Sequence, residues 1–312
     1  MAVNELRESS KRRPLSIRLG ERLMDFSRPR VMGIVNATPD SFWAGSRCGD
    51  AADIASLVEG MLSEGADIID LGGCSTRPGS PQPSEREETE RLDRALDAIR
   101  GRFPDAVVSV DTYRSRVARR CVERWHADII NDISGGDLDP EMTDTVAELG
   151  VPFVAMHMRG TPETMTGLCR YGDVTAEVLE DLARKAGRLH QAGVADVIVD
   201  PGFGFAKNAD LNFEMLSRLE VFRRIGCPLL VGISRKRMIW QTLGTDAAGA
   251  LNGTTVLNTI ALLGGADILR VHDVRAAREA VTLVEAMRRN APADRNTITR
   301  YYPSTNPQTP SR

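Results

Sequence analysis

Polar residues stand at the ends of eight short apolar runs, and they are the first candidates for chemistry. They are Asn36, Asp70, Asp111, Asn131, His157, Asp200, Ser234 and Arg270. Any one of them alone is explained as a helix N-cap or a turn residue. Eight such residues together predict that the ends of the apolar runs meet in one polar opening, the mouth of the domain. Asp111, Asn131 and Asp200 bring carboxylate and amide groups that suit the N–H donors and carbonyl of a flat heterocycle.

Two other segments carry groups that suit phosphate oxygens. Residues 72–79, GGCSTRPG, combine glycines and hydroxyls with the forked donor set of Arg77, although a surface turn would have a similar composition. Arg270 and His272 are two residues apart, so they point to the same side of an extended strand as two potential cations. A structural pair between Asp273 and an arginine is the alternative interpretation.

Two further positions could hold ions. Asn36 offers a neutral oxygen of the kind that suits a hard cation such as Mg²⁺, although a turn role is equally plausible. Residues 234–236, Ser-Arg-Lys, follow the seventh apolar run and precede a predicted helix, whose N-terminus favours anions. The sequence leaves both roles of Asn36 open, that of an Mg²⁺ ligand and that of a turn residue.

The apolar runs themselves predict strands of a parallel sheet. They lie at 31–35, 68–71, 106–110, 128–130, 152–156, 197–199, 229–233 and 267–270. Most are apolar throughout, not alternating, as expected for strands that are covered on both faces. Helical periodicity fills the gaps between them. One predicted face comprises Val174, Val178, Leu182, Ala186 and Leu189, and another comprises Leu92, Leu96 and Ile99.

Eight strand-helix units predict an α/β protein built as one (β/α)8 barrel, the TIM-barrel architecture. EGAD at 64–67 and GGAD at 264–267 are typical of a helix end followed by a strand start. An open doubly wound sheet is the rival fold, but no GxGxxG follows the first strand. In a barrel the active site lies at the C-terminal strand ends, which is where the eight polar residues fall.

The domain organisation follows from the composition along the chain. Residues 1–13 are polar and are predicted to be disordered, and so is the polar segment 292–312. Residues 14–30 are predicted to form a small hairpin that closes one end of the main domain. Residues 31–289 are predicted to form the catalytic barrel as a single domain.

The composition excludes several classes of function. The 312 residues carry 40 Lys+Arg against 43 Asp+Glu, a formal net charge of −3, so neither nucleic acid nor an anionic membrane is an expected partner. No apolar run is long enough to predict a transmembrane helix, and the N-terminus lacks the apolar core of a secretory signal. Five scattered cysteines without a CxxC motif predict reduced thiols and a cytoplasmic location.

Over residues 31–289 the sequence resembles the dihydropteroate synthases. The matching segments are NATPDSF (36–42), GGCSTRPG (72–79), SVDTYR (109–114), INDISGG (130–136), MHMRGTPETM (156–165), DPGFGFAK (200–207), GISRK (232–236) and ALNGTTVLNTIALLGGADILRVHDV (250–274). They occur in the order that the family has, so the resemblance is far more specific than one short motif.

This resemblance implies an enzyme of folate biosynthesis. The reaction that it implies condenses 6-hydroxymethyl-7,8-dihydropterin diphosphate with 4-aminobenzoate, giving 7,8-dihydropteroate and pyrophosphate by an SN1-like path. It also implies Mg²⁺ as the cofactor, a homodimer, and inhibition by sulfonamides, which mimic 4-aminobenzoate.

The family's site residues carry over to the positions that match its motifs. The resemblance implies pterin contacts from Asp111, Asn131, Met156, Asp200 and Lys236. It implies diphosphate contacts from Thr76, Arg77, Arg270 and His272. It implies 4-aminobenzoate contacts from Thr76, Pro78, Phe205, Ser234 and Lys236. Asn36 matches the Mg²⁺ ligand, and the residues expected to act in catalysis are Asp111, Lys236, Arg270 and His272.

Two departures from the family pattern leave alternatives open. Cys74 stands where the family usually has Glu, and the segment 43–47, beginning at Trp43, differs from the usual Ser-Asp-Gly-Gly-like run. We interpret Cys74 as a small neutral filler in preference to a reactive thiol. A non-catalytic pterin-binding paralogue is the main alternative. A pterin-binding methyltransferase domain fits less well, because it would not need the STRPG, SRK and RVH segments.

Overall fold

Eight parallel strands form the centre of the molecule. The computed structural model describes residues 15–37, 51–74 and 82–291. Its barrel strands are β3 (Arg30–Asn36), β4 (Ile68–Gly72), β5 (Val108–Asp111), β6 (Ile129–Asp132), β7 (Phe153–Met156), β8 (Val197–Asp200), β9 (Leu230–Val231) and β10 (Ile268–Val271). The predicted disordered segments 1–13 and 292–312 lie outside the described residues.

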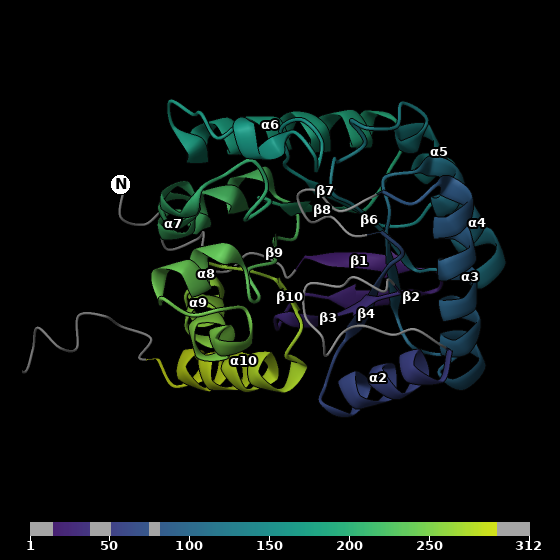
Figure 1. Ribbon diagram of the computed structural model, residues 1–312, viewed down its shortest axis with the longest axis horizontal. Helices are drawn as coiled ribbons and strands as arrows, with labels where there is room; N and C mark the ends of the chain where they lie inside the picture. The colour runs from purple at the N-terminus through teal and green to yellow at the C-terminus, as the bar shows by residue number, and fades with distance from the viewer. Residues whose placement is uncertain (1–14, 38–50, 75–81, 292–312) are drawn as a thin grey trace, which may run out of the picture.

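The strands pair in chain order and close on themselves. β3 to β8 are consecutive neighbours, β10 pairs with both β3 and β9, and all of these pairings are parallel. A parallel bridge between Val199 and Leu229 joins β8 to the start of β9. Figure 1 shows the strands at the centre with the helices around them. The predicted (β/α)8 barrel is therefore confirmed.

Helices cover the outside of the barrel. They are α2 (Ala51–Ser63), α3 (Glu85–Arg102), α4 (Ser115–Trp125), α5 (Met142–Leu149), α6 (Val174–Gln191), α7 (Ala209–Ser217), α8 (Arg237–Thr242), α9 (Leu251–Leu263) and α10 (Val274–Arg289). The five residues predicted to form one face of α6 are all buried, and so are the three on α3. No helix in the described ranges is long and apolar enough to cross a membrane.

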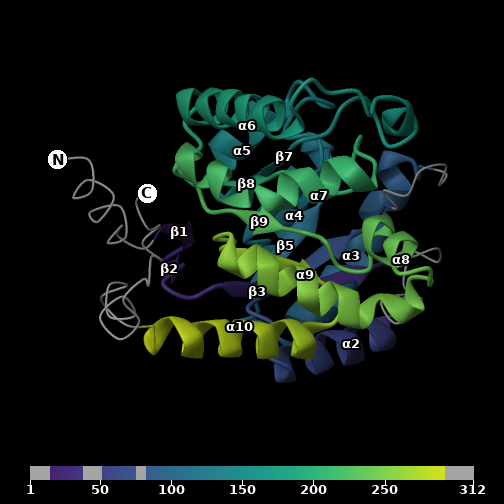
Figure 2. The same cartoon turned by 90° about the vertical axis from the view of Figure 1, so that its left-hand side faces the viewer.

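A short antiparallel hairpin precedes the barrel, as predicted. Its strands are β1 (Ser16–Leu19) and β2 (Arg22–Asp25). Ile17, Leu19 and Phe26 pack in one apolar cluster with residues from the N-terminal halves of the barrel strands, among them Ile68 and Ile268. Figure 2 shows the hairpin at one end of the barrel. This packing closes the end opposite the predicted site, because the site residues lie at the C-terminal strand ends.

The two GAD segments end helices and begin strands as the sequence predicts. Gly65 and Gly265, which follow α2 and α9, have φ of 97° and 94°, a left-handed conformation that glycine adopts without strain. The next aspartates hold neighbouring strands: an Asp67 oxygen accepts the Val31 N–H at 2.8 Å, and an Asp267 oxygen accepts the Leu229 N–H at 2.8 Å.

One predicted strand is too long. The apolar run 229–233 predicts a strand over all five residues, but β9 ends at Val231. Ile233 is nevertheless fully buried, so its apolar character reflects burial and not extended pairing. The chain then turns at Arg235, whose φ is 53°.

Candidate active site

The centre of the barrel mouth is a network of two carboxylates, one guanidinium and one amide. Arg270 Nε donates to Asp70 Oδ2 at 2.6 Å, and its Nη2 donates to Asp111 Oδ2 at 2.7 Å. Asn131 Nδ2 lies 3.2 and 3.3 Å from the two oxygens of Asp70. The Asp70 side chain is 0% exposed and that of Asp111 is 15% exposed. Asp111 therefore presents the accessible carboxylate of this network.

Strand register brings these residues into one layer. Asn36 pairs with Gly72, Gly72 with Asp111, and Asp111 with Asn131, across four neighbouring strands. Gly72 carries no side chain in this row, and a Cβ there would be in ordinary van der Waals contact, 3.7 Å from both Asn36 Oδ1 and Asp111 Cβ. The layer thus carries polar groups on both sides of a position without a side chain.

Burial and neighbouring charges set the protonation of the network. Burial raises the pKa of Asp111 to about 7, Arg270 opposes this shift, and Asp70 adds to it. The two carboxylates in turn hold the pKa of Arg270 above its usual range, in spite of its burial. Arg270 therefore stays charged at neutral pH, and burial favours the protonated form of Asp111 more than water does.

A second group of residues faces the network from β8 and the segment after β9. Burial lowers the pKa of the Lys236 ammonium to about 8, and Asp200 opposes this shift. Lys236 Nζ donates to the Phe203 carbonyl and lies 4.9 Å from the centre of the Phe205 ring. Burial raises the pKa of Asp200, whereas Lys236 and the Gly202 N–H lower it. This group combines a cation, a carboxylate and an aromatic face.

His272 differs from what the sequence predicts. Burial and the charge of Arg270 lower its pKa to about 3, so the imidazole is neutral near pH 7 and is not a second cation. Ser234 Oγ lies 3.0 Å from His272 Nδ1 and accepts the His272 backbone N–H at 3.2 Å. The Ser234 hydroxyl can therefore donate to Nδ1, which leaves the proton of the imidazole on Nε2.

The alternative that the sequence left open, a structural pair between Asp273 and an arginine, also occurs, and the arginine is Arg235. Arg235 donates to the two Asp273 oxygens, both at 2.8 Å, and its Nη1 donates to the carbonyls of Ala247 and Ala248. This bidentate pair joins the turn after β9 to the start of α10. Asp273 is thus structural, while Arg270 is directed at Asp70 and Asp111.

An apolar cluster borders the polar groups. Met156 packs with Ile133, Met158, Met165 and Ala206, and Tyr113, Leu138 and Phe205 pack against this cluster. Met156 is 4% exposed and pairs with Asp200 across β7 and β8. A flat ligand held by the carboxylates would therefore lie beside methionine and aromatic side chains, which suit a ring face.

Three predicted site residues, Thr76, Arg77 and Pro78, lie outside the described residues. Cys74, two residues before Thr76, is among the described residues. Burial and the nearby Glu88 carboxylate raise the pKa of its thiol, which disfavours the thiolate. Its Sγ lies 3.6 Å from Arg114 Nη1. These observations favour the interpretation of Cys74 as a small neutral residue.

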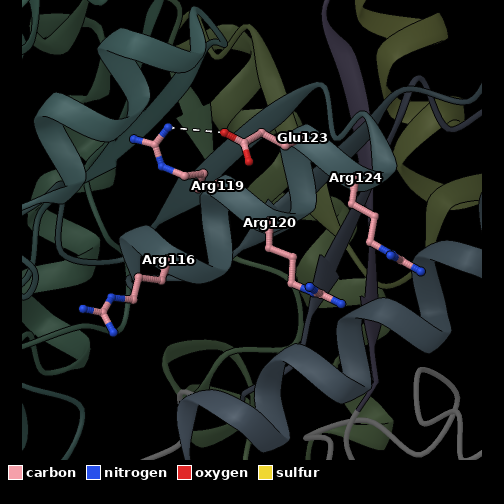
Figure 3. A pocket seen from close by; sticks show the side chains of 5 residues that line it. All are labelled: Arg116, Arg119, Arg120, Glu123 and Arg124. Carbon is pink, nitrogen blue, oxygen red and sulfur yellow. Dashed lines mark hydrogen bonds and ion pairs between the residues drawn. The ribbon is translucent and has the colours of Figure 1, made fainter.

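Figure 3 shows a pocket on the outer surface of α4. It is lined by Arg116, Arg119, Arg120, Glu123 and Arg124. Arg120 donates to both carboxylate oxygens of Asp93, and Arg119 pairs with Glu123 and Glu148. Arg119 and Arg120 are thus paired with neighbouring acids on an exposed face, so we interpret the pocket as a solvated helix face.

Three buried polar residues had no role assigned to them from the sequence. Asp70 was recognised as a strand-end residue, but its bonds to Arg270 and Asn131 were not predicted. The signal for it was an acid inside an otherwise apolar run, IIDLG, all five residues of which are buried. His157 and Lys207 form a buried pair, with Nδ1 and Nζ 2.9 Å apart. No local pattern connects these two residues, which are 50 positions apart.

A barrel with such a mouth is that of the pterin-binding enzymes. The sequence profile of the family described as pterin binding enzyme matches residues 32–272. The dihydropteroate synthase of Escherichia coli (strain K12) is 43% identical over 265 residues, which cover 84% of this chain and 93% of that protein.

Solved structures agree with this assignment. A Yersinia pestis dihydropteroate synthase with a sulfonamide drug complex has a TM-score of 0.84 and 37% identity, covering 89% of this chain and 100% of that chain. The Thermus thermophilus dihydropteroate synthase in complex with 4-aminobenzoate has a TM-score of 0.77 and 38% identity, covering 88% and 100%. The chain belongs to the dihydropteroate synthase family, whose members are transferases of folate biosynthesis.

Proposed function

We propose that the protein condenses 6-hydroxymethyl-7,8-dihydropterin diphosphate with 4-aminobenzoate, giving 7,8-dihydropteroate and pyrophosphate. The observation that carries this proposal is the network in which Arg270 bridges Asp70 and Asp111 beside Asn131. It offers an accessible carboxylate for a cationic ring system and a guanidinium for a departing anion. The 4-aminobenzoate complex of the Thermus thermophilus relative supports the choice of the second substrate.

The pterin is assigned to the side of the mouth that carries the carboxylates. Asp111, Asn131 and Asp200 supply acceptors and an amide for the polar edge of the ring. Lys236 supplies a donor, and Met156 supplies an apolar surface against the ring face. We leave Asp70 out of direct contact, because it is fully buried and bonded within the protein.

The diphosphate is assigned to Arg270 and His272, together with Thr76 and Arg77 outside the described residues. Arg270 uses Nε and Nη2 for the two carboxylates, so Nη1 is the group that can approach the anion. His272 would donate through its Nε2–H as a neutral imidazole. One fixed cation and one neutral donor thus replace the two cations that the sequence predicts.

Asn36 is the residue that we assign to Mg²⁺. Mg²⁺ usually keeps several waters and takes one or two protein oxygens together with substrate phosphates, so a single amide oxygen fits this role. Asn36 pairs with Gly72 in the strand register, and Gly72 has no side chain to cover the Asn36 amide. When bound, the ion would neutralise charge that develops on the diphosphate.

4-Aminobenzoate is assigned to Phe205, Ser234 and the stem of Lys236. Thr76 and Pro78, outside the described residues, complete this group. Phe205 offers an exposed part of its ring next to the Lys236 ammonium, and Ser234 offers a hydroxyl. An aromatic acid can thus stack on Phe205 and accept through its carboxylate from the Ser234 hydroxyl, which would then turn away from His272 Nδ1.

The reaction then needs little covalent chemistry from the protein. The C–O bond to the diphosphate breaks, and its electron pair leaves with the diphosphate. The amine nitrogen of 4-aminobenzoate attacks the resulting methylene cation, a C–N bond forms, and the amine proton passes to pyrophosphate or water. Asp111 stabilises the positive charge on the pterin, while Arg270 and His272 stabilise the leaving group. No residue needs to act as a covalent nucleophile.

Pyrophosphate release by the purified protein tests this function. With pterin diphosphate and Mg²⁺, we expect release that depends on 4-aminobenzoate and is accompanied by dihydropteroate. Tight pterin binding without release or product would instead indicate the non-catalytic paralogue, and Cys74→Glu would then be the variant to examine.

The rate should depend on pH in a bell-shaped manner. The pKa of Asp111 is about 7 and that of Lys236 is about 8. Carboxylate is therefore lost as the pH falls below 7, and ammonium is lost as it rises above 8. We expect kcat/KM for the pterin diphosphate to peak between these values. Lys236→Arg should move the alkaline limb upward, and an alkaline limb that stays in place would contradict this assignment.

We also propose a cytoplasmic homodimer. The four described cysteines are free thiols, as expected in a reducing compartment. Six of the ten exposed large apolar residues in the described ranges lie on the adjacent helices α9 and α10, namely Leu251, Val256, Ile260, Leu263, Leu283 and Met287. These six residues are the patch that we propose a second copy of the chain to cover.

Light scattering should give the mass of a dimer. The double variant Ile260→Asp/Leu283→Asp places two charges in the patch, so we expect it to give the mass of a monomer. Leu23 on the hairpin is 74% exposed and lies outside the patch, so Leu23→Asp is the matched control and should remain dimeric. A monomeric wild-type protein would refute the proposed assembly.

A further inference from the structure

A lysine and a histidine are buried together beneath residues 202–206, the segment that follows β8. Lys207 is 6% exposed and His157 is 2% exposed. Lys207 Nζ lies 2.9 Å from His157 Nδ1 and 3.0 Å from the carbonyl oxygens of both Gly202 and Phe205. These three acceptors match the three N–H bonds of an ammonium group. The proposed reaction uses neither residue.

The histidine is an acceptor in this pair. Burial lowers the pKa of Lys207 well below its usual range, and Asp200 opposes this shift. As an ammonium group Lys207 can only donate, and this form requires an unprotonated His157 Nδ1 with the ring proton on Nε2. Burial and the charge of Lys207 lower the pKa of His157 to about 2, which keeps the imidazole neutral. The His157 backbone N–H donates to the Asp200 carbonyl at 3.0 Å, so the main chain of His157 is fixed to the end of β8.

The segment above this pair has a backbone that needs external support. Gly202, Gly204 and Ala206 have φ of 69°, 81° and 50°. Ala206 is strained at this angle, because its Cβ disfavours the left-handed region. A Cβ at Gly202 would lie 2.1 Å from the His157 carbonyl oxygen, so the segment rests directly on the end of β7.

Side chains bind most of the carbonyl groups of this segment. Lys207 binds those of Gly202 and Phe205, Lys236 binds that of Phe203, and Tyr171 Oη donates to that of Ala206 at 3.1 Å. Removing the Lys207 ammonium would leave two of these carbonyls without that donor. The same segment carries the Phe205 ring, which lies against Lys236.

We propose that Lys207, held by His157, is a positioning residue that fixes Phe205 and so sets the affinity for the aromatic second substrate. This proposal rests on the proposed function, in which Phe205 contacts 4-aminobenzoate. Asp111 and Asn131 lie on other strands, so these two pterin groups do not depend on the segment. Asp200 and Lys236 do contact it, through the Gly202 N–H and the Phe203 carbonyl, so the pterin is expected to lose only part of its contacts. Lys207 should therefore affect the two substrates unequally.

The variant Lys207→Met tests this selectivity, because it keeps the apolar stem and removes the three donors. We expect KM for 4-aminobenzoate to rise about tenfold, because the Phe205 carbonyl loses its lysine donor and the Gly202 carbonyl keeps only the Phe205 N–H. The dissociation constant of the pterin diphosphate should change less than about threefold. An equal loss of affinity for both substrates, or an unchanged KM for 4-aminobenzoate, would overturn the proposal.

A second buried lysine provides the matched control. Lys185 is 1% exposed, and its Nζ donates to the carbonyls of Ser134 at 2.7 Å and Met156 at 3.0 Å. It supports the ends of β6 and β7 and not the segment after β8. Lys185→Met should lower stability without a preferential rise in KM for 4-aminobenzoate. A similar preferential rise would show that any buried lysine has this effect, and would overturn the specific role of Lys207.

A double-mutant cycle tests whether Lys207 acts through Phe205. Phe205→Ala should raise KM for 4-aminobenzoate, and Lys207→Met should then add little further. Additive effects would overturn the mechanism. If Lys207→Met does not fold, His157→Phe removes one of the three acceptors, and the same comparison of the two substrates decides the question.

Nitrogen NMR of the wild-type protein gives an independent test. We expect an unprotonated Nδ1 and a protonated Nε2 at His157 across neutral pH, and the opposite tautomer or a doubly protonated ring would overturn the pair. This measurement does not require catalysis. Absence of 4-aminobenzoate-dependent pyrophosphate release in the wild type would refute the proposed function instead, so the two failures are distinguishable.

Discussion

Replacing Asp111 by Asn should lower kcat by about 10²–10³-fold, the usual effect of removing one group that stabilises charge in a transition state. The carboxylate is accessible at the mouth and lies 2.7 Å from Arg270. Asparagine preserves its shape but removes the negative charge that opposes the developing pterin cation. The chain should still fold, because Arg270 keeps its bond to the buried Asp70.

Steady-state kinetics and thermal unfolding together check this prediction. The matched control is Asp132→Asn, one residue beyond Asn131. Asp132 is also buried, but its oxygens accept the N–H groups of Ser134 and Gly136 at 2.7 and 2.9 Å. We expect that variant to lower Tm more than kcat. Unchanged kcat in Asp111→Asn would remove our account of cation stabilisation.

Arg270→Ala should weaken binding of the pterin diphosphate about 100-fold, whereas binding of the bare pterin should fall much less. The reason is that a charge-assisted contact to an anion exists only when the diphosphate is present. The variant should also lose about 3 kcal/mol of stability, because the 0%-exposed Asp70 would lose its cationic partner. Asn131 still donates to Asp70, so the loss is partial.

Calorimetry with the two ligands, and thermal unfolding, measure these effects separately. Arg235→Ala is the control for a structural arginine, because Arg235 pairs with Asp273 at 2.8 Å and not with the network at the mouth. It should lower stability and affect both ligands alike. An equal loss of affinity for the two ligands in Arg270→Ala would contradict the assignment of Arg270 to the diphosphate.

Much of the site could be predicted from local patterns. Asp111, Asn131 and Asp200 each follow an apolar run, and a barrel must bring such strand ends together. The helical face from Val174 to Leu189 was visible because a 3.6-residue period records which side of a helix is buried. The family resemblance added the roles of these residues, which spacing alone did not determine.

Pairings across the barrel could not be predicted in the same way. Arg270 and Asp70 are 200 residues apart, and His157 and Lys207 are 50 apart. Asp273 was correctly regarded as a potential partner of an arginine, but the sequence did not indicate that Arg235 would be that partner. The predicted length of β9 was wrong, because residues that are buried outside a strand are as apolar as residues that are buried within one.

Periodicity and side-chain type along short stretches were sufficient to predict the eight strand-helix units, the closing hairpin and the polar residues at the strand ends. The folded structure was needed to show that Arg270 bridges Asp70 and Asp111, that burial lowers the pKa of His272, and that Lys207 bonds to the segment carrying Phe205. These properties depend on strand register and on how much water the whole fold excludes from each group, and both are sums over residues distant in the chain.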